Sequence, residues 1–272
     1  MTARFTPSGI RLKPMRPVAT KAGTVNYMLV PGGPGIGSES LADLVGCLPD
    51  GANAWGVDLP GDGSNHHADP YGMWPEILVE AASAFSRTVM VGHSTGGEYI
   101  LSVPEIARHA SGIVLVSTAP DASWMPIFER MCADNPLPGY EEALAAYTAD
   151  PRLATLTALC VASAPWNAAT PEGLARVRDL LARMPYNAAA VEWSAEHFDR
   201  TYRAAWFPRD IPTLVVSGQQ DRIVTQTLWD DDRYQGGSVR QVRIEGAGHW
   251  PWLDRPEAVT VAFEAFAGTL PP

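Results

Sequence analysis

Residues 88–97 read Thr-Val-Met-Val-Gly-His-Ser-Thr-Gly-Gly, and no other part of the sequence says as much about the fold. Four β-favouring residues run directly into Gly92, Ser94 and Gly96, so the pattern Gly-x-Ser-x-Gly stands where a strand should end. A serine on such a sharp turn points its hydroxyl above the edge of the sheet, and the small residues beside it let the backbone bend and a substrate approach. Because serine alone is a weak nucleophile, the chain must also supply a base and an acid that orients the base.

The composition is that of a globular protein. The chain has 272 residues, of which 46% are hydrophobic and 9% aromatic, which suits one α/β domain with an insertion. A net charge of −10 disfavours nucleic acid or an anionic membrane as a partner. No segment approaches the roughly 20 apolar residues of a membrane span. The composition is compatible with a small-molecule substrate and leaves the oligomeric state open.

The number of cysteines and the first 18 residues indicate the cellular compartment. The chain has three cysteines, whose wide spacing fits no zinc-binding pattern, and an odd count suits a reducing environment. The first 18 residues lack the apolar run of a secretory signal. We therefore expect a cytoplasmic protein that needs no metal and no cofactor.

Segments with strand and helix patterns alternate through most of the chain. Strands are expected at 24–30, 52–58, 88–91, 113–117, 212–217 and 239–244, and helices at 40–48, 74–85, from 96 and from about 256. This alternation predicts an α/β fold whose sheet is mostly parallel, with right-handed crossovers and flanking helices.

The alternation breaks between residues 121 and 206. This segment has no clear strand, many Ala, Leu, Trp and Met residues, and seven prolines, so we expect several short helices. The predicted organisation is a core formed by 1–120 and 207–272, with 121–206 inserted as a helical cap before the strand that precedes the candidate acid.

His249 is the best candidate base. It lies in Gly246-Ala-Gly-His-Trp250, directly after the last expected strand, where flanking glycines indicate a loop at the sheet edge. His93 is adjacent to Ser94, so we expect it to pack beneath the turn. The remaining histidines are His66 and His67 in a polar loop, His109 on the surface and His197 in the insertion, where it could face the pocket.

Asp221 is the best candidate acid, because it follows a strand and lies between serine and base in the order Ser, Asp, His. It could also be a helix N-cap for the segment that follows. Three consecutive aspartates at 230–232 are alternatives that look solvated, and Asp254 lies too close to His249 in sequence.

With these residues in place, the chain resembles the α/β-hydrolase superfamily over nearly its full length. The matching pieces are Pro31 to Gly35, Asp58-Leu-Pro-Gly-Asp-Gly-Ser64, Gly92-His-Ser-Thr-Gly96, Gly218-Gln-Gln-Asp221 and Gly248-His-Trp-Pro-Trp-Leu-Asp-Arg-Pro256. The resemblance implies an eight-stranded or slightly truncated sheet, with one early strand missing in the second case, and a helical cap at 121–206.

The resemblance also implies an oxyanion hole, which acyl transfer through serine requires. Thr95, the residue after the nucleophile, would supply one backbone N–H, and Gly33 in the glycine-rich loop would supply the second. Pro34 cannot donate. Pro31 stands where the family loop usually has histidine, which weakens any narrower family assignment.

A dinucleotide-binding fold is the main alternative from another class. Gly32 to Gly37 follows a strand, and Asp58 comes 21 residues after Gly37 (58 − 37), near the position of an acid that binds ribose. However, Ser38 stands where that pattern needs glycine, and no lysine follows as a phosphate loop would need. Neither nucleotide pattern explains the candidate triad, and we expect Asp58 to form a turn at the strand end.

The substrate depends on the insertion, which is rich in aromatic residues. Candidate substrate contacts are Ile36 and Trp250 beside the oxyanion loop and the base, with Trp124, Trp193 and His197 in the insertion. They suggest an apolar or aromatic acyl group of modest size.

Three narrower resemblances remain open. Gly33 to Gly35 and His249-Trp-Pro-Trp look like proline iminopeptidases, which read a free amine with cap carboxylates. Glu192, Glu196 and Asp199 are the candidates for that role, although a solvated helix face is favoured. Gly92 to Glu98 resembles cofactor-free haloperoxidases and esterases, and carbon–carbon bond hydrolases use the same triad order.

The sequence thus predicts a serine hydrolase of small carboxylic esters, lactones or thioesters. An aminopeptidase or amidase, a carbon–carbon bond hydrolase and a non-catalytic receptor or scaffold are the alternatives.

Overall fold

The computed structural model describes residues 2–67 and 71–271. An eight-stranded sheet runs through it in the order β1-β2-β4-β3-β5-β6-β7-β8. The strands are β1 (Arg4–Phe5), β2 (Arg11–Pro14), β3 (Asn26–Val30), β4 (Asn53–Asp58), β5 (Thr88–His93), β6 (Ala110–Val116), β7 (Thr213–Gly218) and β8 (Val239–Ile244). β2 pairs antiparallel with β1 and β4, and every other neighbouring pair is parallel.

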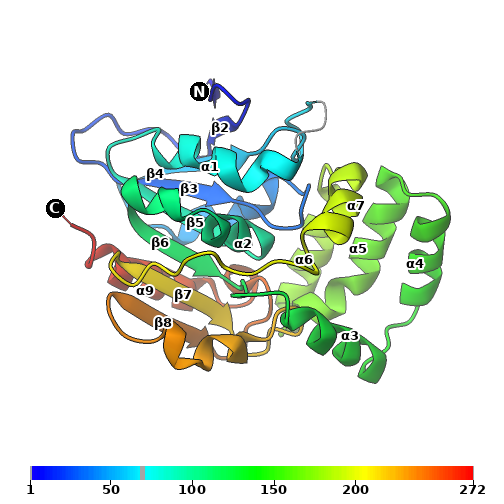
Figure 1. The fold of residues 1–272 in the computed structure, drawn as a ribbon. Coiled ribbons are helices and arrows are strands. Elements are labelled where there is room, and N and C mark those ends of the chain that lie inside the picture. The colour runs from blue at the N-terminus through cyan, green and yellow to red at the C-terminus, as the bar shows by residue number, and fades with distance from the viewer. Residues whose placement is uncertain (1, 68–70, 272) are drawn as a thin grey trace.

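Helices cover both faces of the sheet (Figure 1). The α-helices are α1 (Trp74–Ala82), α2 (Thr95–Ser102), α3 (Trp124–Asp134), α4 (Tyr140–Ala149), α5 (Leu153–Asn167), α6 (Pro171–Arg183), α7 (Ala188–His197), α8 (Pro251–Asp254) and α9 (Pro256–Ala267). Short 3-10 helices are η1 (Ser38–Leu41), η2 (Asp43–Cys47), η3 (Tyr71–Met73), η4 (Pro104–Arg108), η5 (Gln226–Asp230) and η6 (Asp232–Tyr234). None of the helices within the described ranges is long and apolar enough to cross a membrane.

The central strands are buried on both faces because successive side chains point to opposite sides. In β3, Tyr27 and Leu29 join the hydrophobic cluster that also contains α9 residues. Met28 and Val30 join the other cluster, which contains α1 and α2 residues. A fully buried run such as β3 therefore has no polar alternation, as expected of a parallel strand between two helical layers.

The strand order places a ligand crevice at one edge of the sheet. β3 lies between β4 and β5, so the chain leaves β3 towards one side and leaves β5 towards the other. The loops after two such strands run in opposite directions and leave a crevice between them. Ligands of open α/β sheets bind in this crevice. The loops in question are residues 31–37 and the turn at Ser94.

Five helices, α3 to α7, lie between β6 and β7 in the chain. Figure 1 shows them gathered together at the right of the view, beyond the ends of the strands. Apart from an isolated bridge between Asp121 and Arg203, this segment contains no strand. We call residues 121–206 the insertion.

One expectation from the sequence is wrong in detail, and one alternative that was left open is decided. Residues 40–48 do not form an amphipathic α-helix but lie in η1 and η2, since Gly46 and Pro49 leave too short a run for α-helical turns. Of the two sheets that the resemblance left open, the structure has the eight-stranded one, which β1 and β2 complete. β2 has the sequence Arg-Leu-Lys-Pro and only one buried residue, so it lacked the apolar pattern of the strands that were predicted.

Candidate active site

Ser94 lies on a sharp turn between β5 and α2. Its φ angle is +52°, which is strained for a residue other than glycine. The glycine at 96 is required by close approach, because a Cβ there would lie 2.4 Å from the carbonyl oxygens of Val30 and Pro31. At Gly92 a Cβ would lie 2.5 Å from the Gly97 nitrogen. The Gly-x-Ser-x-Gly pattern is thus explained by backbone packing that holds the serine at the end of the sheet.

His249 and Asp221 are brought together from two loops. The Nδ1 atom of His249 lies 3.0 Å from Oδ2 and 3.2 Å from Oδ1 of Asp221, and both side chains are buried. Because a carboxylate accepts only, Nδ1–H donates and Nε2 is left to accept a proton. Asp221 also accepts from the amides of Ile223 and Val224, so it caps its own loop as well as holding the imidazole.

Ser94 and His249 line one cavity. No hydrogen bond joins Ser94 Oγ to His249 Nε2 among the bonds of the described residues, a separation that is common before a substrate binds. The alternative acids take no part in this arrangement. Asp230 and Asp231 pair with arginines near the surface, and Asp232 is exposed.

Gly33 and Thr95 also line the cavity. Within residues 2–67 and 71–271, neither amide donates to an acceptor of the protein. Gly32 packs directly on the serine turn, since a Cβ there would lie 2.8 Å from the Ser94 Cβ. Both residues of the predicted oxyanion hole therefore line the same cavity as Ser94, and their amides have no acceptor among the described residues.

The cavity has a volume of about 260 Å³, which is the size of a small organic ligand. Its lining is mostly apolar. The insertion contributes Trp124, Phe128, Leu156, Cys160, Ser163, Asn167, Leu181, Tyr186, Val191 and Asp199, and the core contributes Gly33, Pro34, Ile36, His93, Ser94, Thr95, Ile223, His249 and Trp250.

Of the five predicted substrate contacts, Ile36, Trp124 and Trp250 line the cavity. Trp193 and His197 do not. Trp193 packs against Tyr71 with ring centres 6.4 Å apart, and His197 stacks on Trp193 in an exposed position. This correction has a simple cause: both residues lie on a face of α7 that is turned away from the cavity.

The three candidate carboxylates in and just after α7 lie in different environments. Glu192 and Glu196 are exposed, whereas Asp199 lines the cavity and accepts a hydrogen bond from Ser194 Oγ at 2.6 Å. Burial raises the pKa of Asp199. Its neighbour Glu98, in the first turn of α2, is fully buried, and burial together with Asp199 raises the pKa of Glu98 well above its usual value. Sequence reasoning missed Glu98, although its position one helical turn after Ser94 was an available signal.

His93 does more than pack beneath the turn. Its Nε2 lies 3.1 Å from the backbone oxygen of His249, and since a carbonyl only accepts, Nε2–H is the donor. Burial lowers the pKa of His93 well below its usual value, so the ring is neutral. The residue before the candidate nucleophile thus holds the loop of the candidate base.

The insertion also holds the His249 loop. The backbone oxygen of Asn167 accepts from the amide of His249 at 3.0 Å. Asp254 is buried and accepts from the amides of Gly248 and Thr170 at 2.9 Å. Asp254 is therefore a link between the insertion and the loop, and not a partner of the imidazole.

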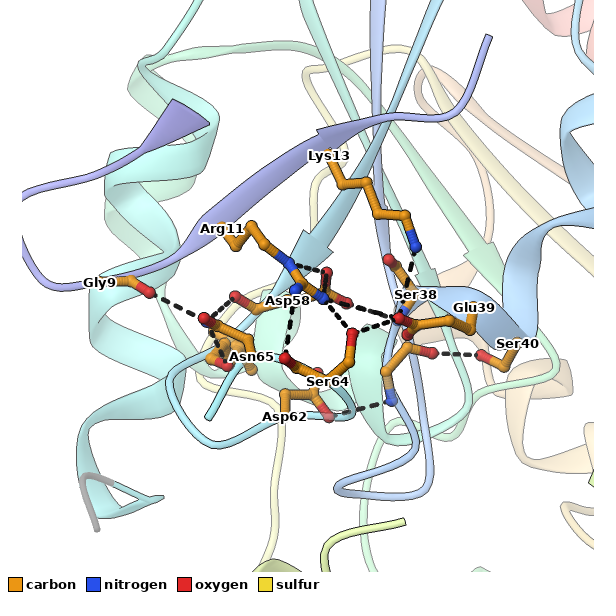
Figure 2. Close-up of polar contacts among 12 residues, drawn as sticks. Gly9, Arg11, Lys13, Ser38, Glu39, Ser40, Asp58, Asp62, Ser64 and Asn65 are labelled. Atoms are coloured by element: carbon orange, nitrogen blue, oxygen red, sulfur yellow. Dashed lines mark hydrogen bonds and ion pairs between the residues drawn. The ribbon is translucent and has the colours of Figure 1, made fainter. Parts of the chain in front are cut away.

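A polar network holds the end of the glycine-rich loop, at residues 37 and 38, as Figure 2 shows. Asp58 is buried, and its carboxylate accepts from the Ser38 amide at 2.7 Å and from Nε and Nη2 of Arg11 at 2.9 and 2.7 Å. Asp62 accepts from the Gly37 amide at 3.2 Å. The interpretation of Asp58 as a ribose-binding acid fails, because its oxygens are already occupied within the protein. Across the described parts of the chain, no three His, Cys, Asp or Glu side chains form a group that could hold a metal ion.

Comparison with known proteins identifies relatives of this chain. The model of the alpha/beta hydrolase family matches residues 28–262. A pimeloyl-[acyl-carrier protein] methyl ester esterase from Xylella fastidiosa (strain M12) is 27% identical over 228 residues, which cover 79% of this chain and 84% of the relative. A protein of the same description from Xanthomonas campestris pv. campestris (strain B100) is 26% identical over 221 residues, which cover 79% of this chain and 84% of the relative.

Solved structures share the fold. A proline iminopeptidase-related protein from Thermus thermophilus superposes with a TM-score of 0.73 at 20% identity, covering 99% of this chain and 98% of the other. An esterase from Exiguobacterium antarcticum superposes with a TM-score of 0.73 at 16% identity, covering 98% of this chain and 99% of the other.

Proposed function

The chain belongs to the alpha/beta hydrolase family, and we propose that it hydrolyses small carboxylic esters, lactones or thioesters through an acyl-enzyme on Ser94. One observation carries the proposal: a strained serine shares a cavity with His249, whose imidazole is paired with the buried Asp221 carboxylate, and with Gly33 and Thr95, whose backbone amides have no acceptor among the described residues. These are the parts that acyl transfer to serine requires.

In the proposed first half-reaction, Ser94 Oγ attacks the carbonyl carbon while His249 Nε2 takes the Oγ proton. Asp221 holds the ring through Nδ1–H and stabilises the imidazolium that forms. The carbonyl oxygen gains the negative charge and accepts from the amides of Gly33 and Thr95. The C–O or C–S bond to the leaving group then breaks, and the leaving group takes the proton from His249.

In the second half-reaction a water molecule attacks the acyl carbon. His249 takes a proton from the water, the same two amides receive the oxyanion, and the bond to Ser94 Oγ breaks. The proton returns to Oγ, which releases a carboxylic acid and restores the serine.

The size and lining of the cavity favour an acyl group of modest size. About 260 Å³ of mostly apolar space leaves room for a short aliphatic or single-ring group beside Ser94. The curated relatives carry the name of a methyl ester esterase, so methyl esters of small carboxylic acids are the first natural substrates to test.

The test is hydrolysis of a short p-nitrophenyl ester by the wild-type protein and by Ser94→Ala. We expect the substitution to lower kcat/KM by about 10⁴-fold or more, because the nucleophile and its covalent step are lost. Ser163 also lines the cavity, and Ser163→Ala is the matched control that should keep the ester-cleaving step. Full activity of Ser94→Ala would overturn the mechanism.

An aminopeptidase that removes an N-terminal proline is the second candidate. It is favoured by one observation, the carboxylate of Asp199 in the cavity wall, which could pair with the ammonium group of a substrate. Comparing proline naphthylamide with an uncharged ester of similar size separates the two functions. A preference for the amide that disappears in Asp199→Asn would establish the peptidase, and a preference for the uncharged ester would reject it.

A further inference from the structure

The link between α6 and α7 lies against the glycine-rich loop that carries Gly33. The amide of Asn187 donates to the backbone oxygen of Gly35 at 3.0 Å. The two segments touch so closely that a Cβ on Gly35, whose φ is +80°, would lie 2.8 Å from the backbone oxygen of Asn187. The insertion and the loop are therefore in direct backbone contact at this point.

The side chain of Asn187 adds a second tie. Its Nδ2 donates to the backbone oxygen of Gly61 and to Tyr71 Oη, the latter at 2.9 Å. Its Oδ1 accepts from the Ala190 amide at 3.3 Å, which caps the N-terminus of α7. A carbonyl only accepts and an amide N–H only donates, so these partners fix the orientation of the side-chain amide.

Three contacts hold the two ends of the loop between Gly32 and Ser38. Gly32 packs on the Ser94 turn, and Asp62 and Asp58 accept from the amides of Gly37 and Ser38 (Figure 2). All three of these supports belong to the core. The backbone oxygen of Gly35, two residues from Gly33, accepts from two amides: that of Gly63 in the core at 3.3 Å and that of Asn187 in the insertion at the shorter distance of 3.0 Å.

We propose that Asn187 is a positioning residue that holds the Gly33 amide where the oxyanion forms. The inference rests on the proposed function, because it assigns Asn187 a part in that reaction. Asn187 acts through the loop and touches no reacting atom. A small displacement of an oxyanion donor weakens the transition state more than the bound substrate, since the negative charge appears only in the transition state.

The test uses Asn187→Ser, which keeps a side-chain oxygen to cap α7 but cannot reach Gly61. We expect kcat for a short p-nitrophenyl ester to fall about tenfold while KM changes less than about twofold. The inhibition constant of a trifluoromethyl ketone, which forms a tetrahedral oxyanion on serine, should rise by the same factor as kcat falls. If Asn187 only stabilised the fold, the decrease in kcat and the increase in the inhibition constant of the ketone would not be equal.

Two further variants keep the inference falsifiable. Asn187→Asp retains the cap of α7 and places a carboxylate oxygen opposite the carbonyl of Gly61, so its kcat should be lower than that of Asn187→Ser. Asn135→Ser removes a side-chain amide bond to the Met131 oxygen at the exposed end of α3, and it should leave kcat and the ketone inhibition unchanged.

The outcomes separate this inference from the proposed function. If Asn187→Ser and Asn187→Asp keep the wild-type kcat and ketone inhibition, Asn187 is only a helix cap and the inference is wrong. If the wild-type protein hydrolyses no ester and the ketone does not bind, the proposed function fails, and the inference falls with it.

Discussion

The edge of the sheet and the insertion meet at one cavity, but different physical constraints shape them. At the edge formed by the carboxyl ends of the strands, the central strands β3, β5 and β7 are fully buried. Backbone atoms approach so closely there that only glycine fits at several positions. In the insertion, α3 and α4 have no buried residue, yet Trp124 and Phe128 of α3 still line the cavity. Backbone geometry thus sets the proposed chemistry, whereas side-chain volume sets what can enter.

The largest effect should come from the sheet edge. His249→Ala should lower kcat/KM by about 10⁴-fold or more, because the proposed base is removed from its pair with Asp221. His109→Ala changes an exposed histidine at the end of η4 and serves as the control. An equal loss of kcat/KM in His249→Ala and His109→Ala would show that the effect is not specific to the proposed base.

The backbone constraint at the same edge can be tested without touching a proposed catalytic group. In Gly96→Ala a Cβ would lie 2.4 Å from two carbonyl oxygens, so the turn must shift. We expect the free energy of unfolding to fall by about 1–3 kcal/mol, with a loss of activity, in thermal or denaturant unfolding. At Gly46 no atom of the described residues, apart from its neighbours in the chain, lies within 4 Å of an added Cβ, and Gly46→Ala should be nearly neutral. The same cost at both positions would contradict this explanation of the glycine pattern.

The insertion should respond differently. Trp124→Ala enlarges the cavity beside Ser94, so the ratio of kcat/KM for an aromatic acyl ester to that for an acetate ester should rise about fivefold. The proposed triad is untouched, and activity on the small ester should persist. Ile127→Ala, on the exposed side of α3, is the matched control and should leave the ratio unchanged. A collapse of all activity in Trp124→Ala would show that the insertion contributes to the chemistry itself.

The smallest effect concerns the support behind the glycine-rich loop. Burial, and then the nearby charge of Asp58, raise the pKa of Asp62 well above the usual range of an aspartate. Between the ordinary pKa and the raised one, the folded state binds more protons than the unfolded state, so stability decreases as pH rises through this range. Asp62→Asn keeps the acceptor for the Gly37 amide but cannot ionise.

The Tm of Asp62→Asn minus that of the wild type should accordingly be larger at about pH 8 than at about pH 5. A difference that stays constant, or that shrinks as pH rises, would show that Asp62 is not held as a neutral acid in the fold.

The sequence was most informative where local patterns determine the structure. The largely apolar runs that became β3 to β7, and the glycines around Ser94, can each be explained from the local sequence. Asp221 and His249 follow strands of a parallel sheet, so their meeting at one edge could be expected.

The rest depends on contacts between distant segments. Trp193 and Trp124 are both tryptophans on helices of the insertion, and nothing local distinguishes the one that lines the cavity from the one that packs on Tyr71. The link from Asn187 to Gly35 and Gly61 joins residues more than a hundred positions apart, so no sequence window contains it. β2 escaped prediction because its sequence, Arg-Leu-Lys-Pro, has two charged residues and a single buried one and so resembles a loop.

The most direct test of the central claim is covalent labelling with a fluorophosphonate, followed by mass spectrometry of the labelled peptide. We predict one adduct on Ser94 in the wild-type protein and a much slower reaction in His249→Ala. An active wild-type protein that carries no adduct, or carries it on Ser163 in the same cavity, would contradict the claim that Ser94 is the nucleophile.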